Sequence, residues 1–496
     1  MKADPADEVG PDEVGLSTGQ MRITALIVAT ALLMQGLDGT IVATALPAMA
    51  KSFHAEPIHM SLALTSYLLS LAIFIPASGW FADRFGSRTV FRAAILIFTI
   101  GSVFCGLADS LGMLIGARIV QGIGGAMMVP VGRLLLLKSV KRADMIAATS
   151  WFTMPALIGP IIGPPLGGFI VTYISWRWTF GINVPIGIIG IIAVSLFVAE
   201  VKDTENAGKL DLLGLFWSGC AMALLMTGFE TIGNGLIPLD ASIGCFIAGS
   251  IAAYAYWRHA HIHPHPVLDL TLLRIHTFAN STLAGSFFRI LAGAIPFLLP
   301  LMLQIGFGDT AAKSGTITFI AAVGALAMKP LAQPILRRFG FRASMVAFGS
   351  LSVVFTLACA AFRPDSPIIW IDLALLLGGV FRSLQFTALN TIAYADVPRA
   401  RMSAATSFYA TFQQITLTLG ISLAAGTLDA TSAITGHITP TIDDFSIAFI
   451  LVSLIGAIAV PISARLSPQA GDDISGHHAL PVQAPIAATT PPPDRG

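Results

Sequence analysis

Long runs of apolar residues, separated by short polar stretches, fill the chain from residue 23 to residue 465. A run of about 20 apolar residues is long enough to cross a bilayer as an α-helix. Fourteen such runs, each bounded by charged residues or by clusters of Pro and Gly, predict fourteen transmembrane helices. They lie near residues 23–47, 58–80, 91–108, 111–136, 145–171, 180–199, 211–232, 237–257, 278–303, 314–335, 343–361, 367–391, 403–427 and 445–465.

The composition of the chain excludes a soluble protein. Of the 496 residues, 55% are hydrophobic and only 11% are charged, whereas soluble domains carry about 25% charged residues. The sequence contains no phosphate-binding loop, nucleophile elbow or HExxH motif, so we predict neither an enzyme nor a cofactor or metal site. A net charge of +1 gives no reason to expect a nucleic acid partner. The predicted fold class is an all-α, multi-pass membrane protein.

The basic residues between the predicted helices indicate the orientation of the chain. With the N-terminus placed inside, the inner segments hold 19 Lys and Arg residues and the outer loops hold 4. Basic residues concentrate on the cytoplasmic side of membrane proteins. Because the number of predicted spans is even, we expect both termini to be cytoplasmic.

An internal repeat divides the chain into two equivalent parts. The sequence RFGSR at 84–88 recurs as RFGFR at 338–342, which is 254 residues later. Arg118-x-x-Gln121 has a weaker echo in Arg382-x-x-Gln385. Two parallel six-helix halves with substrate held between them are a known transporter plan. We therefore predict a cytoplasmic N-terminal tail at 1–22, a six-helix bundle at 23–200, an inserted helix pair with a cytoplasmic loop at 201–276, a second six-helix bundle at 277–466 and a disordered cytoplasmic tail at 467–496.

Four motifs in the first half resemble those of the major facilitator superfamily, specifically its fourteen-helix drug:proton antiporter branch. They are LDGTIVATALP at 37–47, GWFADRFGSR at 79–88, RIVQGIGGA at 118–126 and GPIIGPPLGG at 159–168. The chain departs from the usual pattern at Ala43, where that branch usually has Asn, and at Ser87, where a basic residue is usual.

This resemblance implies a secondary active exporter of the bacterial inner membrane that exchanges protons for drugs or metabolites by alternating access. Its partners would be a small-molecule substrate, protons and the lipid bilayer. The expected state is a monomer, with accessory efflux proteins left open. Two alternatives remain: an importer or facilitator of an organic anion or other solute, and a membrane sensor that does not transport.

Asp38 and Arg118 are the predicted residues for proton coupling or substrate binding. Asp38 lies near the middle of the first run, where an uncompensated charge costs at least about 2.5 kcal/mol. Arg118, in the fourth run, stays charged at any relevant pH and could oppose the carboxylate. A packing role for Asp38 and a purely structural role for Arg118 are the alternatives.

Two further motifs suggest conformational roles. Gly79, Asp83, Arg84, Gly86 and Arg88 form the inner loop between spans two and three, and we interpret them as a gating loop rather than a substrate contact. The alternative is an ordinary solvated loop.

The fifth span has Gly159, Gly163 and Gly167 at intervals of four, together with Pro160 and Pro164. Small residues at this spacing allow close helix packing in lipid. The resemblance implies that this antiporter helix seals the path against ion leak.

Polar residues within other spans are candidates for the lining of a cavity: Gln121, Arg289, Arg382, Gln385 and Gln413. Five basic residues lie within the spans, against one deep acid, Asp38. This balance favours anionic, zwitterionic or neutral substrates.

Four histidines alternate after the eighth span, at 259, 261, 263 and 265. Their spacing in a loop is not that of two ligands on one face of a helix. We therefore interpret the segment as a weakly basic cytoplasmic loop, and metal binding stays an open question.

Overall fold

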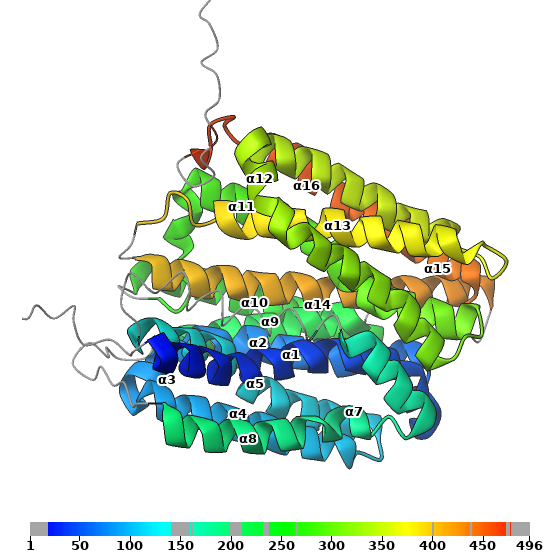
Figure 1. The fold of residues 1–496 in the computed structure, drawn as a ribbon, viewed down its shortest axis with the longest axis horizontal. Helices are drawn as coiled ribbons and strands as arrows, with labels where there is room; N and C mark the ends of the chain where they lie inside the picture. The colour runs from blue at the N-terminus through cyan, green and yellow to red at the C-terminus, as the bar shows by residue number, and fades with distance from the viewer. Residues whose placement is uncertain are drawn as a thin grey trace, which may run out of the picture.

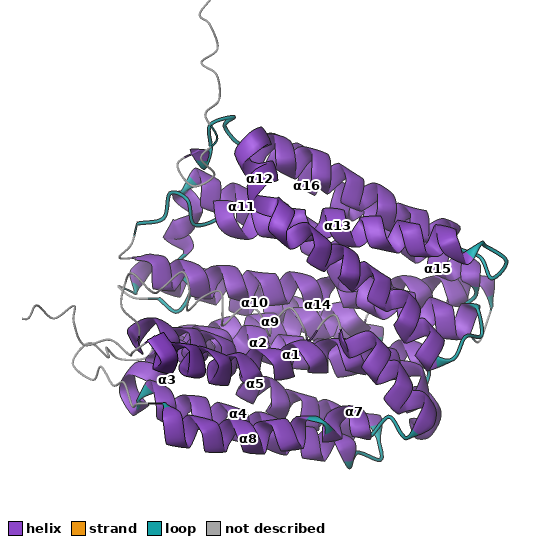
Figure 2. Cartoon of the chain, in the orientation of Figure 1, coloured by secondary structure: helices purple, strands orange, loops and turns teal. Residues whose placement is uncertain are grey.

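The computed structural model describes residues 18–139, 159, 162–198, 211–231, 238–263, 266–398, 401–436, 439–472 and 477, and all regular structure among them is helical (Figure 2). Within these described residues, twelve helical stretches are long and apolar enough to cross a membrane. One of these, Ala311–Ala361, contains two predicted spans, because Gly340 interrupts it with a φ of 71°. The fifth predicted span lies mostly outside the described residues. The all-α membrane class is confirmed, and the count of fourteen stays a prediction.

The first half of the chain forms one helical bundle (Figure 1). Its elements are α1 (Thr18–Phe53), α2 (Ser61–Phe74), α3 (Ser78–Phe85), α4 (Ser87–Gly106), α5 (Leu111–Ser139), the helical segment 162–173, α7 (Trp178–Gly181) and α8 (Asn183–Phe197). In α8, Gly187 and Gly190 face the bundle, whereas Ile188, Ile189 and Ile192 are more than half exposed. Large apolar side chains on the outside and small residues inside are the pattern expected where lipid is the solvent.

The second half forms a corresponding bundle on the other side of the molecule (Figure 1). Its elements are α11 (His276–Leu301), α12 (Ala311–Ala358), α13 (Ile368–Ile392), α14 (Met402–Thr435), α15 (Ile442–Ala457) and α16 (Ala459–Ser463). Between the bundles in sequence come α9 (Leu212–Thr231) and α10 (Leu239–Ile262), which pack together as an antiparallel pair. Helix α9 contacts α2 of the first bundle and α14 of the second.

The repeated RFG motif adopts the same backbone in both halves. Gly86 connects α3 to α4 with a φ of 92°, and Gly340 breaks α12 with a φ of 71°. Only glycine takes up this region without strain. The phenylalanines that precede them, Phe85 and Phe339, are about half exposed, at 51% and 53%. The sequence repeat therefore marks a repeated helix–turn–helix corner.

The two bundles share one apolar cluster at the end of the molecule predicted to be outside. It joins Leu46 and Met49 of α1 to Leu298 of α11 and Leu428 of α14, all of which are buried. Hydrogen bonds reinforce this end: Gln304 Nε2 donates to the Thr44 carbonyl at 3.2 Å. The apolar clusters nearer the other end belong mainly to one bundle each. The two bundles are thus packed together at the end predicted to be outside.

A short linker, including the turn Leu270–Arg274, connects α10 to α11 and is tied to the second bundle. Asp269 accepts from Arg401 Nη2 at 2.6 Å and from Thr271. Partial burial raises the pKa of Asp269, but the hydrogen bonds from Thr271 and Arg401 outweigh it and lower this pKa overall. The contact is therefore complete at neutral pH and is lost as the pH falls through the folded-state pKa.

Two expectations from the sequence need correction. The histidine segment is not a loop from residue 258 on, because α10 continues to Ile262 and the His263 N–H donates to the His259 carbonyl at 2.9 Å. The tail expected to be disordered also begins as packed structure: Ala470 contacts the apolar cluster of the second bundle, and His477 Nδ1 lies 3.0 Å from the Arg337 carbonyl oxygen.

The close approach of α4 and α5 generates a prediction about stability. A methyl group on Gly124 would lie 2.5 Å from the Phe98 nitrogen, so Gly124→Ala should lower the free energy of unfolding by about 1–3 kcal/mol. Gly116→Ala, on the same helix with no heavy atom within 4 Å of the added carbon, is the matched control and should be neutral or slightly stabilising, because alanine favours the helix more than glycine does. Thermal unfolding of the purified proteins in detergent measures both. Equal effects would contradict this account of the packing.

Candidate functional site

Asp38 lies at the centre of the first bundle and is 1% exposed. Its Oδ2 accepts from Arg118 Nη1 at 2.5 Å. Its Oδ1 accepts from Gln121 Nε2 at 2.7 Å and from Asn183 Nδ2 at 3.1 Å. The pairing of Asp38 with Arg118 expected from the sequence is therefore present. The carboxylate receives three donors, which is the arrangement that an ionised acid needs when no water surrounds it.

Arg118 is fully buried and is held from two further directions. Its Nε donates to the Ala63 carbonyl of α2 at 2.7 Å, and its guanidinium carbon lies 4.2 Å from the centre of the Tyr67 ring. Its Nη1 also donates to Gln121 Oε1 at 2.6 Å. Nη2 has no hydrogen-bond partner among the described residues, so one nitrogen of the guanidinium is a buried donor that could still donate to a new partner's oxygen.

Three further residues, which the sequence did not single out, complete this network. Asn183 is the first residue of α8, and Ser102 lies in α4; Ser102 Oγ accepts from Gln121 Nε2 at 2.8 Å and from Asn183 Nδ2 at 3.2 Å. Tyr67 lies on α2 beneath the guanidinium. An isolated Asn in an apolar span was the signal available for Asn183, whereas Ser and Tyr within spans are too common to be informative.

The arginine motif brings α2, α4 and α5 close enough for these contacts. Arg118 and Gln121 are three residues apart and therefore face the same side of α5. A methyl group added at Gly122 would lie 2.5 Å from the Ser70 side chain of α2, and one added at Gly101 of α4 would lie 2.7 Å from the Gln121 backbone. A side chain at either glycine would push the helices apart and separate Arg118 from Asp38.

The glycines of the predicted antiporter helix pack against the same stretch of α1 that carries Asp38. Gly159 lies against Leu37, Gly163 against Thr40, and Gly167 against Thr44 and Ile41. The small-residue packing expected from their spacing is thus present. Pro160 lies outside the described residues.

The neighbouring face of segment 162–173 packs against the second bundle. The Pro164 carbonyl lies close to Gly315 of α12, Gly168 lies against Ala311, and Thr172 Oγ1 accepts from the Ala312 N–H at 3.0 Å. This one segment therefore contacts the helix of Asp38 on one side and the opposite bundle on the other.

The predicted gating loop is only partly described. Arg84 is exposed at the end of α3, and Arg88 Nη2 donates to the Ser195 carbonyl of α8 at 2.5 Å. The side chain of Asp83 lies outside the described residues. A methyl group added at Gly79 would meet no heavy atom within 4 Å, so packing does not require a glycine there.

In the second bundle, Arg289 of α11 is buried and has no acidic partner among the residues that the structure describes. It is 1% exposed; its Nη2 donates to Asn390 Oδ1 at 2.9 Å, and its guanidinium carbon lies 4.5 Å from the centre of the Tyr409 ring. The ion pairs found among the described residues do not include Arg289. Within the described part of the chain, a neutral amide and an aromatic face are therefore the groups that stabilise its charge.

The other predicted cavity residues do not converge on one site. Gln121 belongs to the Asp38 network, and Arg382 has no ion-pair partner among the described residues. Gln385 is 1% exposed against Gly349, and neither of its amide atoms has a hydrogen-bond partner within the described part of the chain. Gln413 is half-buried on α14. The Arg-x-x-Gln motif is thus repeated in the sequence, but the second copy does not form the hydrogen-bond network that Arg118 and Gln121 form in the first.

A cavity of about 290 Å³ lies elsewhere, where α9 meets α2, α5 and α14. Apolar side chains and the hydroxyls of Thr65, Ser70, Thr227, Thr418 and Ser422 contribute to its lining. The described residues around it include none of the predicted cavity residues.

Comparison with known proteins identifies the class to which this fold and buried ion pair belong. The model of the Major Facilitator Superfamily matches residues 28–421. The chain belongs to this superfamily and is a membrane transporter of small molecules, not an enzyme.

Particular relatives narrow the comparison. A Pectobacterium carotovorum protein named "Putative multidrug resistance protein MdtD" is 37% identical over 409 residues, which cover 82% of this chain and 87% of that protein. A protein of the same name from Shigella boydii is 39% identical over 403 residues, covering 80% and 84%.

Solved structures show the same fold at much lower identity. A D-xylose–proton symporter superposes with a TM-score of 0.67 at 14% identity, covering 90% of this chain and 98% of that chain. The peptide transporter PepTSo gives a TM-score of 0.66 at 14% identity, covering 89% and 97%.

The ion pair generates a prediction about energetic coupling. Arg118→Met leaves the Asp38 carboxylate buried without its counter-ion, which should cost about 3–5 kcal/mol of unfolding free energy. Adding Asp38→Asn should restore much of this loss, because both charges are then absent. Unfolding of the two single variants and the double variant in detergent measures the coupling. Additive effects would mean that the two side chains do not stabilise each other.

Proposed function

We propose that this chain is a proton-coupled exporter that exchanges inward-moving protons for an outward-moving small molecule by alternating access. The observation that carries the proposal is the fully buried contact between Asp38 and Arg118. The name of the relatives, which describes multidrug resistance, supports export as the direction. We place the protein in the bacterial inner membrane with both termini in the cytoplasm, on the basis of its basic inner segments.

Protonation of Asp38 would change the whole network. A protonated carboxyl group no longer attracts Arg118 strongly, and its hydroxyl needs an acceptor. Asn183 Oδ1 is buried beside it and has no hydrogen-bond partner among the described residues. Rotation of the Asn183 amide would present this oxygen to the new proton. The site thus has a donor for the charged state of Asp38 and an acceptor for the neutral state.

The position of Asp38 on α1 would connect this change to movement of the bundles. Thr40 and Thr44 on the same helix pack against segment 162–173, whose other face contacts α12. A shift of α1 on protonation would therefore reach the interface between the bundles. The charged loop with Arg84 and Arg88 would stabilise one of the two arrangements at the cytoplasmic end.

The second bundle suggests the charge of the substrate. Arg289 is buried among neutral partners, and a substrate carboxylate or phosphate would provide the missing negative charge. This supports anionic, zwitterionic or neutral substrates over dications. An importer or facilitator of an organic anion would use the same residue, so the direction of transport needs its own test. A sensor without transport would have no use for a proton-dependent Asp38.

The first test of function uses inverted membrane vesicles with an imposed pH gradient and a panel of labelled compounds. Asp38→Asn keeps the size and shape of the side chain but cannot bind and release a proton, and should reduce gradient-driven uptake by at least about tenfold, a loss of about 1.4 kcal/mol. Asp109→Asn, an exposed carboxylate between α4 and α5, is the matched control and should transport normally. Uptake that is indifferent to Asp38→Asn, or absent for every compound, would reject the mechanism.

The second test addresses substrate charge. Arg289→Gln should raise the KM for anionic compounds at least about tenfold and leave neutral compounds less affected, because only anions lose a charge partner. Competition assays in the same vesicles give both values. Transport of divalent cationic dyes that depends on Asp38 would contradict this preference.

A further inference from the structure

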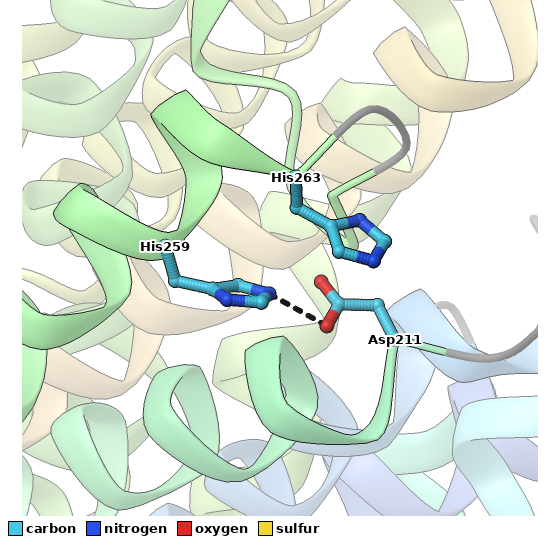
Figure 3. A group of neighbouring side chains, drawn as sticks. All are labelled: Asp211, His259 and His263. Atoms are coloured by element: carbon cyan, nitrogen blue, oxygen red, sulfur yellow. Dashed lines mark hydrogen bonds and ion pairs between the residues drawn. The ribbon is translucent and has the colours of Figure 1, made fainter.

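Three potential metal ligands converge at the cytoplasmic end of the inserted helix pair (Figure 3). Asp211 precedes α9, whereas His259 and His263 lie at the end of α10. One donor atom from each of the three side chains lies within 4.8 Å of the others. None of these residues takes part in the Asp38 network.

The two histidines share one face of the helix. Because α10 continues to Ile262, His259 and His263 are separated by one turn, and their rings stack with centroids 5.1 Å apart. This i, i+4 arrangement of histidines is a common way to present two imidazoles to one ion. His261, between them, points elsewhere: it is exposed and its Nδ1 lies 2.8 Å from the Trp257 carbonyl oxygen.

Asp211 is held in place before any ion is added. It is 6% exposed, its Oδ1 accepts from the Gly214 N–H at 2.8 Å, and its Oδ2 accepts from the Val267 N–H at 3.3 Å. The same Oδ1 lies 2.7 Å from His259 Nε2. Hydrogen bonds that orient a ligating carboxylate are a regular feature of metal sites in proteins.

We propose that Asp211, His259 and His263 bind one divalent transition-metal ion of the Zn²⁺, Co²⁺ or Ni²⁺ class. Two imidazole nitrogens and one carboxylate oxygen suit these ions, whereas Ca²⁺ and Mg²⁺ prefer sites made of oxygen alone. Bonds of about 2.0–2.2 Å need donor atoms roughly 3–3.5 Å apart. On binding, the His259 nitrogen would give up its proton, the 2.7 Å contact between Asp211 Oδ1 and His259 Nε2 would lengthen, and the half-buried His263 ring would turn toward the ion. Water would complete the coordination.

The ion would connect the cytoplasmic ends of the two inserted helices, α9 and α10, to the linker that follows them. Asp211 begins α9, the histidines end α10, and Val267 belongs to the linker toward the second bundle. The site is remote from Asp38, so the metal has a structural role and is not the transported substrate. The inference does not depend on the direction of transport.

A second group of acids and histidine provides an internal comparison. Glu56, His59 and Asp429 also gather, at the opposite end of the molecule. Glu56 is exposed, and its Oε2 lies 3.9 Å from His59 Nε2, which is beyond hydrogen-bond distance. This group contains a single imidazole and no comparably buried carboxylate, so we expect it to bind metal weakly.

The experiment uses the full-length protein in detergent, purified with a tag that contains no histidine. After equilibration with Zn²⁺ and removal of free ion, elemental analysis should find one tightly bound Zn²⁺ per chain. His259→Ala and His263→Ala should each weaken binding at least about 100-fold, because even outer hydrogen-bond partners of a metal site are worth about 10–100-fold. His261→Ala and His59→Ala are the matched controls and should retain the ion.

Two further measurements separate loss of the site from loss of the fold. Asp211→Asn keeps the helix cap but provides a poorer ligand, so it should weaken binding while eluting as a monodisperse protein. Co²⁺ should give the visible absorption of a low-symmetry nitrogen–oxygen site in the wild type and in His261→Ala, but not in His259→Ala. Absence of bound Zn²⁺ in the wild type would overturn the proposal, and so would retention of the ion in both His259→Ala and His263→Ala.

Discussion

The structure of the first bundle depends on one constraint: a charge in the hydrocarbon region must be satisfied by the protein itself, because no water is present to do so. Asp38 and Arg118 meet this requirement together, and neither could be buried alone without a large cost. Their remaining hydrogen-bonding groups recruit Gln121, Ser102 and Asn183. The network therefore requires α1, α2, α4, α5 and α8 to surround one point. A change of charge at this point would alter contacts to all five helices.

The two halves of the molecule use the same architecture for different electrostatic purposes. The RFG corners at Gly86 and Gly340 have matching backbones, so the repeat is real in three dimensions. The first half, however, contains a balanced pair, while the second half contains Arg289 beside an amide and an aromatic ring. A symmetric scaffold thus holds a buried ion pair on one side and, among the described residues, a buried cation without an acidic partner on the other. This asymmetry is what distinguishes coupling from substrate recognition in the mechanism proposed above.

Close backbone packing connects these sites to the interface between the bundles. Gly163 and Gly167 bring segment 162–173 against α1, and its other face meets α12 at Gly315. Without side chains at these positions, the helix backbones are in direct contact, so a displacement of one helix would be passed to the next. The shared apolar cluster at the end predicted to be outside, which includes Leu46 and Leu298, would be the point about which such movement occurs.

The sequence alone determined the membrane class, the position of the apolar spans, the repeat, and the prominence of Asp38 and Arg118. These follow from local properties, because hydropathy and motif spacing are read along the chain and report where lipid replaces water. Only the tertiary structure decided which polar groups meet. Asn183 reaches Asp38 across 145 residues, and Asp211 reaches His259 across 48. It also decided that α10 extends far enough to align His259 with His263, because a helix end depends on the contacts made there and not on hydropathy alone. Burial away from water gives the Asp38 contacts their strength, and helix packing, which no local pattern encodes, selects the partners at both sites.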